Sequence, residues 1–298
     1  MAAPLGDLFT AMVTPFNPDG SVNFPSARRL AHHLVDTGSD GIVVCGTTGE
    51  GPTVSDREKI DLLDALVEEV GASTCVVANT GTYDTHHSTA LTRAAVEAGA
   101  DAFLAVTPYY NKPPRAGIVA HFAAIAEAAE GRPVVVYNIP QRVVLNLEPD
   151  VLAELAEIPN VVAVKQATAD LDQARRILAE TDLLLYAGND DLLYPFLKLG
   201  GKGGICVASH VAGKQLRRMI DLAHRGDMDG AKAQDAALYD LYTALAVTTN
   251  PIPVKAALNL LGHEVGGLRL PLVEADAEQT AKVAAALEAA GIRSAAKV

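Results

Sequence analysis

One lysine of this sequence stands where covalent chemistry with a carbonyl compound is possible. Lys165 directly follows the apolar run VVAV at 161–164, so a short buried strand would carry its amine to the strand end. Apolar surroundings disfavour the ammonium form of a lysine, and a neutral amine attacks a ketone or an aldehyde. A strand-end lysine that extends its ammonium group into solvent has the same local sequence. Lys165 is therefore a candidate Schiff-base residue that needs suitable neighbours.

Such neighbours follow other apolar runs. Thr47 and Thr48 lie within GTTGE at 46–50, where backbone N–H groups and hydroxyls can hold a carboxylate without a metal. The phenols of Tyr110 and Tyr137 could pass protons to and from an imine. Arg142 could bind the carboxylate of a second substrate in bidentate fashion. Taken singly, the threonines also fit ordinary turn chemistry that caps the next helix. A tyrosine at a strand end is more often a packing residue, and a lone loop arginine is usually solvated.

No other lysine has a comparable setting in the sequence. Lys255 follows NPIPV, outside the expected strands. The remaining candidates lie on expected helix faces or in loops at helix ends: Lys59, Lys198, Lys202, Lys214 and Lys232.

The elements that must position these side chains alternate between two patterns. Short apolar runs predict eight strands, and amphipathic segments of helical period lie between them. The strands are expected near 8–13, 40–45, 74–79, 102–107, 133–138, 161–165, 183–188 and 204–208, and the clearest helices at 26–37, 56–70, 86–98, 117–130 and 170–180. Eight such units predict an α/β fold, the (β/α)8 TIM barrel, whose active site lies at the carboxyl ends of the strands.

The domain organisation follows from the same pattern. Residues 1–225 are expected to form the barrel, and residues 226–298, rich in Ala and Leu, a C-terminal helical extension packed on it. Ser55 followed by Glu58 is a capping box that predicts a helix start, and Pro149 with Asp150 predicts another.

Composition excludes several classes of protein. The formal net charge is −12 with no basic tract, which argues against binding to nucleic acid or to an anionic membrane surface. Cys45, Cys75 and Cys206 lie in apolar runs and are expected to be reduced. The N-terminus lacks the pattern of a signal peptide, and no apolar stretch is long enough to span a bilayer, so we expect a cytoplasmic protein.

Cofactor motifs are also missing from the sequence. The paired histidines at 32–33 and 86–87 lack the spacing of an HExxH site, and we expect no metal. Neither dinucleotide nor P-loop glycine motifs occur.

Seven motifs in order resemble the dihydrodipicolinate synthase and N-acetylneuraminate lyase family over nearly the whole chain: GTTGE at 46–50, VTPYYNKP at 106–113, YNIPQR at 137–142, VAVKQAT at 162–168, AGND at 187–190, NPIPVK at 250–255 and LRLP at 268–271. The resemblance implies a barrel enzyme that binds pyruvate as an imine on Lys165, with no further cofactor. It implies that Tyr137 shuttles protons and that Thr47 and Tyr110 complete a relay. It also implies that Thr48 binds the pyruvate carboxylate and that Gly188 and Ile205 line the pocket.

Partners are implied by the same resemblance. In the family, the tyrosine at the position of Tyr110 enters from a neighbouring subunit, so a homotetramer built as a dimer of dimers is expected. Arg142 favours the synthases of the family, which condense pyruvate with L-aspartate 4-semialdehyde in lysine and diaminopimelate biosynthesis. Two alternatives stay open: a pyruvate-dependent aldolase acting on 2-oxo-3-deoxy sugar acids or N-acetylneuraminate, and a catalytically silent metabolite-binding barrel.

Departures from the family pattern surround the specificity residue and the lysine. Gln141 and Val143 flank Arg142, while Gln166 and Ala169 follow Lys165. These changes bear on the choice of aldehyde. They leave the Schiff-base lysine and the three relay residues unchanged: Lys165, Tyr137, Thr47 and Tyr110.

Feedback inhibition is a further property of many family members, which bind lysine at a subunit interface. Lysine-sensitive members tend to have a serine, an amide and an acid there to bind the amino acid. The matching positions in this chain are Gly51, Pro52, Tyr83 and His87. We therefore expect weak or absent inhibition by lysine.

Overall fold

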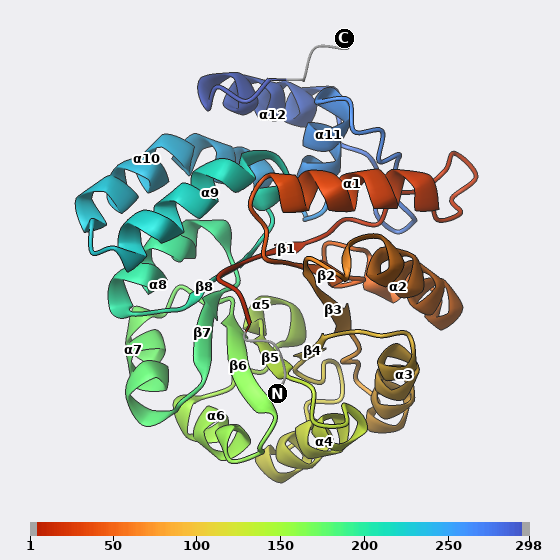
Figure 1. The fold of residues 1–298 in the computed structure, drawn as a ribbon, viewed down its shortest axis with the longest axis vertical. Helices are drawn as coiled ribbons and strands as arrows, with labels where there is room; N and C mark the ends of the chain where they lie inside the picture. Colours follow the sequence, from red (N-terminus) through yellow and green to blue (C-terminus); the bar gives the residue numbers. More distant parts are fainter. Residues whose placement is uncertain (1–4, 294–298) are drawn as a thin grey trace.

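The computed structural model describes residues 5–293, and eight parallel strands close into a barrel in chain order (Figure 1). Each strand pairs with the next, and β8 pairs with β1 to complete the ring. The strands are β1 Leu8–Ala11, β2 Gly41–Val44, β3 Cys75–Asn79, β4 Ala102–Val106, β5 Val134–Asn138, β6 Val161–Gln166, β7 Leu184–Ala187 and β8 Gly203–Cys206. The expected (β/α)8 barrel is thus confirmed, although β1 ends two residues before its expected end.

A ring of helices covers the outside of the barrel (Figure 1). It consists of α1 Phe24–Asp36, α2 Asp56–Val70, α3 Thr85–Glu97, α4 Arg115–Ala128, the short α5 Pro140–Val143, α6 Pro149–Ala156, α7 Leu171–Glu180, α8 Leu193–Leu199 and α9 Ser209–His224. The capping box at Ser55 forms as expected and starts α2. Two single turns, η1 Gly51–Thr53 and η2 Asp190–Leu192, follow β2 and β7.

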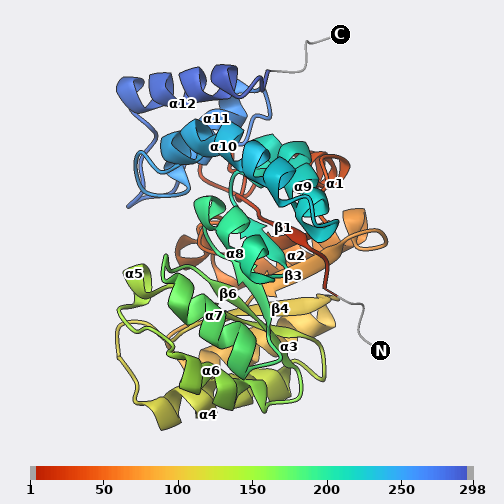
Figure 2. The same cartoon turned by 90° about the vertical axis from the view of Figure 1, so that its left-hand side faces the viewer.

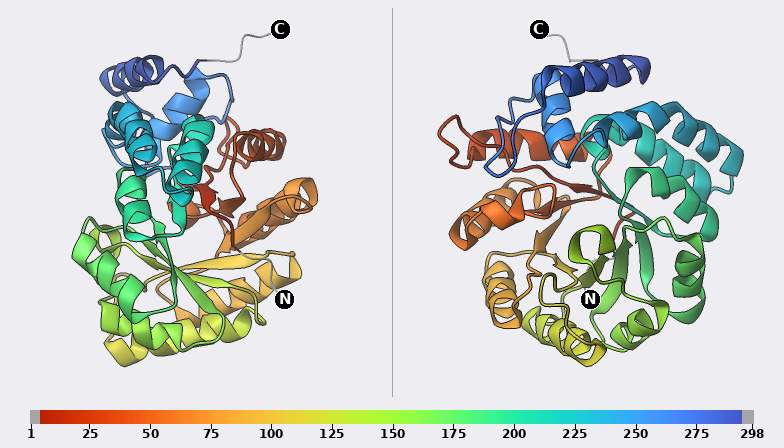
Figure 3. Two further views of the ribbon diagram at one scale, coloured as in Figure 1. Left: turned by 60° about the vertical axis from the view of Figure 1, so that its left-hand side comes forward. Right: turned by 180° about the vertical axis from the view of Figure 1, so that it is seen from behind.

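Three more helices follow the last unit: α10 Met228–Leu245, α11 Ile252–Leu260 and α12 Ala277–Ala289. α10 packs against α9, and α12 packs against both α10 and α11. In Figures 2 and 3 this blue segment lies at one edge of the molecule, close to α1. Ser26 of α1 donates a hydrogen bond to the carbonyl oxygen of Glu264, which joins the segment to the barrel.

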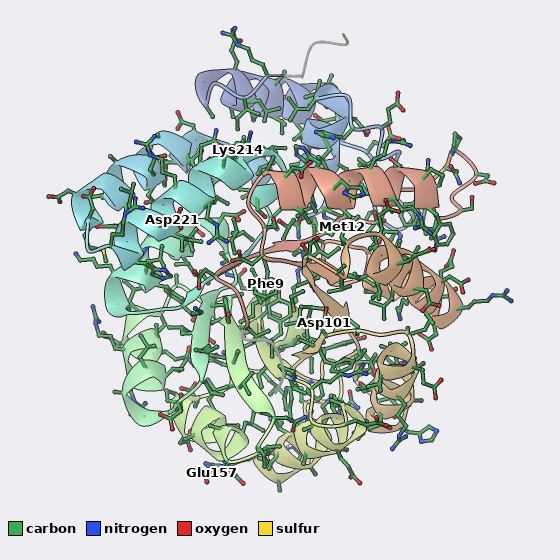
Figure 4. The ribbon with its side chains drawn as sticks, viewed as in Figure 1. Phe9, Met12, Asp101, Glu157, Lys214 and Asp221 are labelled. Carbon is green, nitrogen blue, oxygen red and sulfur yellow. The ribbon has the colours of Figure 1, made fainter. Side chains whose placement is uncertain are left out.

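Strand alternation decides which side chains enter the barrel. Figure 4 shows Phe9 near the centre, where its ring meets that of Tyr186 edge-on with centroids 5.8 Å apart. Gly41 leaves room for Phe9, because a Cβ there would lie 2.2 Å from the ring. By the same alternation the odd-numbered positions 163 and 165 of β6 face inward, which directs the amine of Lys165 into the barrel.

Among the described residues, no helix is both long and apolar enough to cross a membrane.

Candidate active site

Lys165 and Tyr137 face each other inside the barrel because they are register partners on β6 and β5. Both side chains are buried, with 4% of each exposed. The Lys165 Nζ lies 4.3 Å from the centroid of the Tyr137 ring. Among the described residues, this Nζ has no hydrogen bond or ion pair. A buried primary amine without a partner is free to attack a carbonyl carbon.

A cavity of about 1070 Å³ reaches this amine from the carboxyl ends of the strands. Its walls come from the β2 and β5 ends, from the segment after β7 and from α10 and α12. Six of the residues singled out in the sequence line it: Thr47, Thr48, Tyr137, Arg142, Lys165 and Gly188. The closed ring of strands therefore brings together groups that are up to 141 positions apart in the chain, between 47 and 188.

The turn that carries Thr47 and Thr48 is held tightly against the barrel. Thr14 donates a 2.6 Å hydrogen bond to the carbonyl oxygen of Gly49. A Cβ at Gly51 would lie 2.2 Å from the carbonyl oxygen of Cys45, so only glycine fits there. Thr48 is 2% exposed, and its Oγ1 accepts a 2.9 Å hydrogen bond from the side-chain amide of Asn250.

Arg142 lies in α5 and lines the same cavity. Its Nη2 donates a 3.3 Å hydrogen bond to the backbone carbonyl of Asn250. Asn250 therefore contacts both Arg142 and the turn at 46–50 that carries Thr47 and Thr48, which we call the hydroxyl turn. Sequence reasoning missed this residue, since it lies outside the eight units; its only signal was the NPIPVK motif.

Two candidates lie apart from the cavity. Tyr110 is 93% exposed and has a φ of 71°, a left-handed conformation that is unfavourable for a tyrosine. Ile205 is 2% exposed and packs in the apolar interior of the barrel, and it does not line the cavity. The single chain thus assembles six of the eight candidates around one space.

Gln166, which follows the lysine, turns away from the amine. Its amide accepts a 3.0 Å hydrogen bond from Asn138 and donates one of 2.8 Å to Gln173 of α7, between the strands and the helix layer. Strand alternation explains this, because neighbours on a strand face opposite sides. Gln141 lines the cavity, whereas Val143 is buried and does not line it.

Lys255 is also buried, which its place outside the expected strands did not predict, but its surroundings differ from those of Lys165. Lys255 of α11 is 1% exposed, and its Nζ lies 2.6 Å from Oε1 of Glu50, a carboxylate that is also 1% exposed. The ammonium group donates a 2.7 Å hydrogen bond to the carbonyl of Gly267 and lies 4.2 Å from the Phe16 ring centroid. Burial lowers the pKa of Lys255, and the Glu50 carboxylate opposes this shift. The sequence could not show this because α11 meets Glu50 only in the folded chain.

The cysteines and histidines take part in packing, hydrogen bonds and ion pairs. In the part of the chain that the structure describes, no group of three His, Cys, Asp or Glu residues could hold a metal ion. Burial raises the pKa of Cys45 to about 12, so its thiol stays protonated. His210 accepts a 3.0 Å hydrogen bond from the backbone of Val13, and burial lowers its pKa to about 4.

A second cavity, of about 630 Å³, adjoins the first, because Thr47, Arg142 and Asn250 line both. Its walls include all four positions considered for lysine inhibition: Gly51, Pro52, Tyr83 and His87. The His87 Nε2 is 2.6 Å from Oδ2 of Asp56, and the Tyr83 and Tyr109 rings stack edge-on at 5.3 Å.

The chain is similar to known proteins over nearly its whole length. Residues 4–290 match the model of the Dihydrodipicolinate synthetase family. The 4-hydroxy-tetrahydrodipicolinate synthase of Desulforudis audaxviator is 48% identical over 286 residues, which cover 95% of this chain and 97% of the relative.

Two solved structures superpose with a TM-score of 0.94. One is dihydrodipicolinate synthase from Cyanidioschyzon merolae with lysine bound, which is 42% identical, and the match covers 96% of this chain and 98% of that one. The other is the chloride-inhibited dihydrodipicolinate synthase of Acinetobacter baumannii complexed with pyruvate, which is 35% identical, with 97% and 100% covered.

Proposed function

The chain belongs to the Dihydrodipicolinate synthetase family, and we propose that it condenses pyruvate with L-aspartate 4-semialdehyde to give 4-hydroxy-tetrahydrodipicolinate, a step of lysine and diaminopimelate biosynthesis. The observation that carries this proposal is the unpaired amine of Lys165, buried beside Tyr137 at the floor of a cavity with hydroxyl groups and a guanidinium group in its walls. No metal or organic cofactor enters the chemistry, because the electron sink is the imine itself.

The reaction starts when the Lys165 amine attacks the ketone carbon of pyruvate. Tyr137, whose ring lies against the amine, supplies the proton that lets the carbinolamine hydroxyl leave as water, and an imine forms. Loss of a methyl proton converts the imine into an enamine. Holding this nucleophile and the aldehyde in one cavity replaces a bimolecular encounter with a positioned one.

The second substrate completes the product. The enamine carbon attacks the aldehyde carbon of the semialdehyde, and the aldehyde oxygen takes up a proton to become the 4-hydroxyl group. The substrate amine then attacks the imine carbon, releases Lys165 and closes the six-membered ring. Arg142 binds the semialdehyde carboxylate, since its exposed guanidinium group faces the same cavity as the amine.

Pyruvate is oriented through its carboxylate by Thr48 and the adjacent backbone N–H groups. Thr47 lies next to Thr48 and relays protons from Tyr137 towards solvent. Gly188 lines the same cavity and presents only its backbone to the carboxylate. A side chain does not fit at this position, because a Cβ would lie 2.8 Å from that of Ala167. Ile205 supports this pocket from the apolar interior beneath it.

Tyr110 joins the relay from a neighbouring subunit. Its ring is exposed in the single chain and held in an unfavourable backbone conformation, which suits a side chain whose contacts are made with another copy. We accordingly propose a homotetramer arranged as a dimer of dimers, acting in the cytoplasm, with each active site completed across one interface.

A comparison of aldehydes tests the proposed activity. The wild-type protein is assayed for ring formation from pyruvate and L-aspartate 4-semialdehyde, and for pyruvate release from N-acetylneuraminate and from 2-oxo-3-deoxy sugar acids. Ring formation should dominate, because Arg142 is placed to hold a carboxylate rather than a polyol chain. Faster cleavage of a sugar acid would assign the aldolase activity, and absence of turnover with every substrate would indicate a binding protein. The Lys165→Met variant is the matched blank.

A further inference from the structure

The hydroxyl turn at 46–50 ends in a residue that the chemistry above leaves unused. Glu50 lies two positions beyond Thr48 and is 2% exposed. Its φ of 54° places it in the left-handed region, which is unfavourable for a residue other than glycine. A buried carboxylate in an unfavourable backbone conformation needs partners that hold it there.

Its partners come from two distant segments near the C-terminus. Lys255 of α11 forms an ion pair with Oε1 at 2.6 Å, and the backbone N–H of Arg269 donates a 3.0 Å hydrogen bond to Oε2. The Phe16 ring has Lys255 at 4.2 Å and the Arg269 guanidinium group at 4.5 Å from its centroid. Arg269 in turn binds Glu58 of α2, so two anions and two cations balance in the cluster.

The same segment also contacts the turn directly. Asn250, just before α11, donates to Oγ1 of Thr48, while Lys255 lies one helical turn further on and donates its backbone N–H to Pro251. One short piece of chain therefore holds the turn at Thr48 and at Glu50. Thr14, which follows β1, also donates a hydrogen bond to Gly49, so little freedom is left to the turn.

We propose that the buried Glu50–Lys255 ion pair is a positioning device for the reaction, which keeps the hydroxyls and N–H groups of the Thr47–Thr48 turn in the geometry that binds the pyruvate carboxylate. This inference rests on the proposed function. A buried ion pair adds little net stability compared with apolar side chains of similar volume, so stability alone does not account for one at this place. The motifs GTTGE, NPIPVK and LRLP, scattered in the sequence, meet at this pair.

Kinetics of three variants test the proposal: Glu50→Gln, Lys255→Met and the double variant with both changes. Arg217→Met is the control, because Arg217 pairs with Asp40 at the opposite end of the barrel, beside the start of β1. Each protein is assayed for kcat and for KM of both substrates, with its thermal midpoint recorded. Both single variants should raise the KM for pyruvate about tenfold, the loss expected when hydrogen bonds to a charged group are misaligned, with a much smaller change in kcat.

The signs of the effects separate positioning from other roles. A purely electrostatic role would make Glu50→Gln lower the KM for pyruvate, because the uncompensated Lys255 would attract the anion. If the ion pair only stabilised the fold, the double variant would have wild-type kinetics, because it has no uncompensated buried charge and folds normally. Positioning predicts a raised KM in all three variants, and the double variant keeps the proposal testable if Lys255→Met fails to fold. A folded Glu50→Gln or double variant with a KM for pyruvate within about twofold of wild type overturns it.

Trapping of the wild-type imine with borohydride separates this proposal from the one on which it rests. Absence of a pyruvate adduct on the wild-type protein would remove both. An adduct on the wild-type protein together with unchanged KM values in the variants would remove only the role of the ion pair.

Discussion

Lys165 and Lys255 are the two buried lysines in the described part of the chain, and only Lys255 has a carboxylate beside it. Lys255 is surrounded by a counter-ion, a carbonyl oxygen and an aromatic ring, which together satisfy an ammonium group. Lys165 meets a phenol ring and an open cavity. On the proposed chemistry, burial alone does not make a lysine a nucleophile: its amine must also lack a fixed partner and face a space that admits a substrate.

The largest effect is expected when the free lysine is removed. Lys165→Met should lower kcat by at least about a thousandfold, because no other amine can form the imine. The thermal midpoint should stay the same or rise, since an apolar side chain replaces a buried amine without partners. Steady-state assays and thermal melts check both. Residual activity above about one percent would remove Lys165 from the chemistry.

Removal of the paired lysine should instead reduce stability. Lys255→Met leaves Glu50 buried without a counter-ion and should lower the free energy of unfolding by about 3–5 kcal/mol. Urea denaturation followed by circular dichroism measures this change. Addition of Glu50→Gln should recover most of it, because the uncompensated charge is then gone. A loss below about 1 kcal/mol in the single variant would contradict the description of Lys255 as a structural cation.

A change at the neighbour of the free lysine should affect chemistry and leave the fold intact. Tyr137→Phe keeps the ring against Lys165 but removes the hydroxyl, and kcat should fall about a hundredfold, as for loss of a general acid or base. Stopped-flow measurement of imine formation should slow in parallel. Unchanged imine formation would assign the proton transfers to another group.

The specificity residue should act on one substrate only. Arg142→Met should raise the KM for L-aspartate 4-semialdehyde about tenfold to a hundredfold through loss of charged hydrogen bonds, with little change for pyruvate. Arg175→Met, an exposed arginine of α7 that lines neither cavity, is the control. Equal effects on both substrates would mean that Arg142 supports the cavity rather than the aldehyde.

The smallest effect on the rate is expected when free L-lysine is added as an inhibitor. Among the described residues that line the second cavity, the one carboxylate is Glu50, which is already paired with Lys255, and His87 is paired with Asp56. An amino acid would find no free acid there for its ammonium group. Low millimolar L-lysine should therefore leave the initial rate unchanged, and strong inhibition in that range would show that another arrangement binds it.

Much of the site was predictable because a parallel barrel gathers the carboxyl ends of its strands. The apolar runs placed Lys165, Tyr137 and the residues after β2 and β5 at one end, and the structure confirms the barrel on which that prediction depends. The outward orientation of Gln166 also followed from strand alternation and could have been predicted. The division at residue 225, the assembly of subunits and the roles of the site residues stay predictions.

The contacts of Asn250 and Lys255 could not be predicted from the sequence, for a physical reason. Both contact the hydroxyl turn from about 200 positions away in the chain, as the Asn250–Thr48 hydrogen bond shows, and neither belongs to the repeating units. The hydrophobic pattern of a segment indicates which face of a helix or strand is apolar. It does not indicate which distant helix packs on that face. A lysine among apolar residues of a helix was the one available sign that its charge would need a buried partner.

The most direct test of the comparison between the two lysines is borohydride reduction in the presence of pyruvate, followed by peptide mass spectrometry. The reduced adduct adds the mass of pyruvic acid less one oxygen atom. It should appear on the peptide that contains Lys165, be absent from Lys165→Met and never occur on Lys255 in the folded protein. No adduct on Lys165, or an adduct on Lys255, would contradict the assignment of the free lysine as the nucleophile.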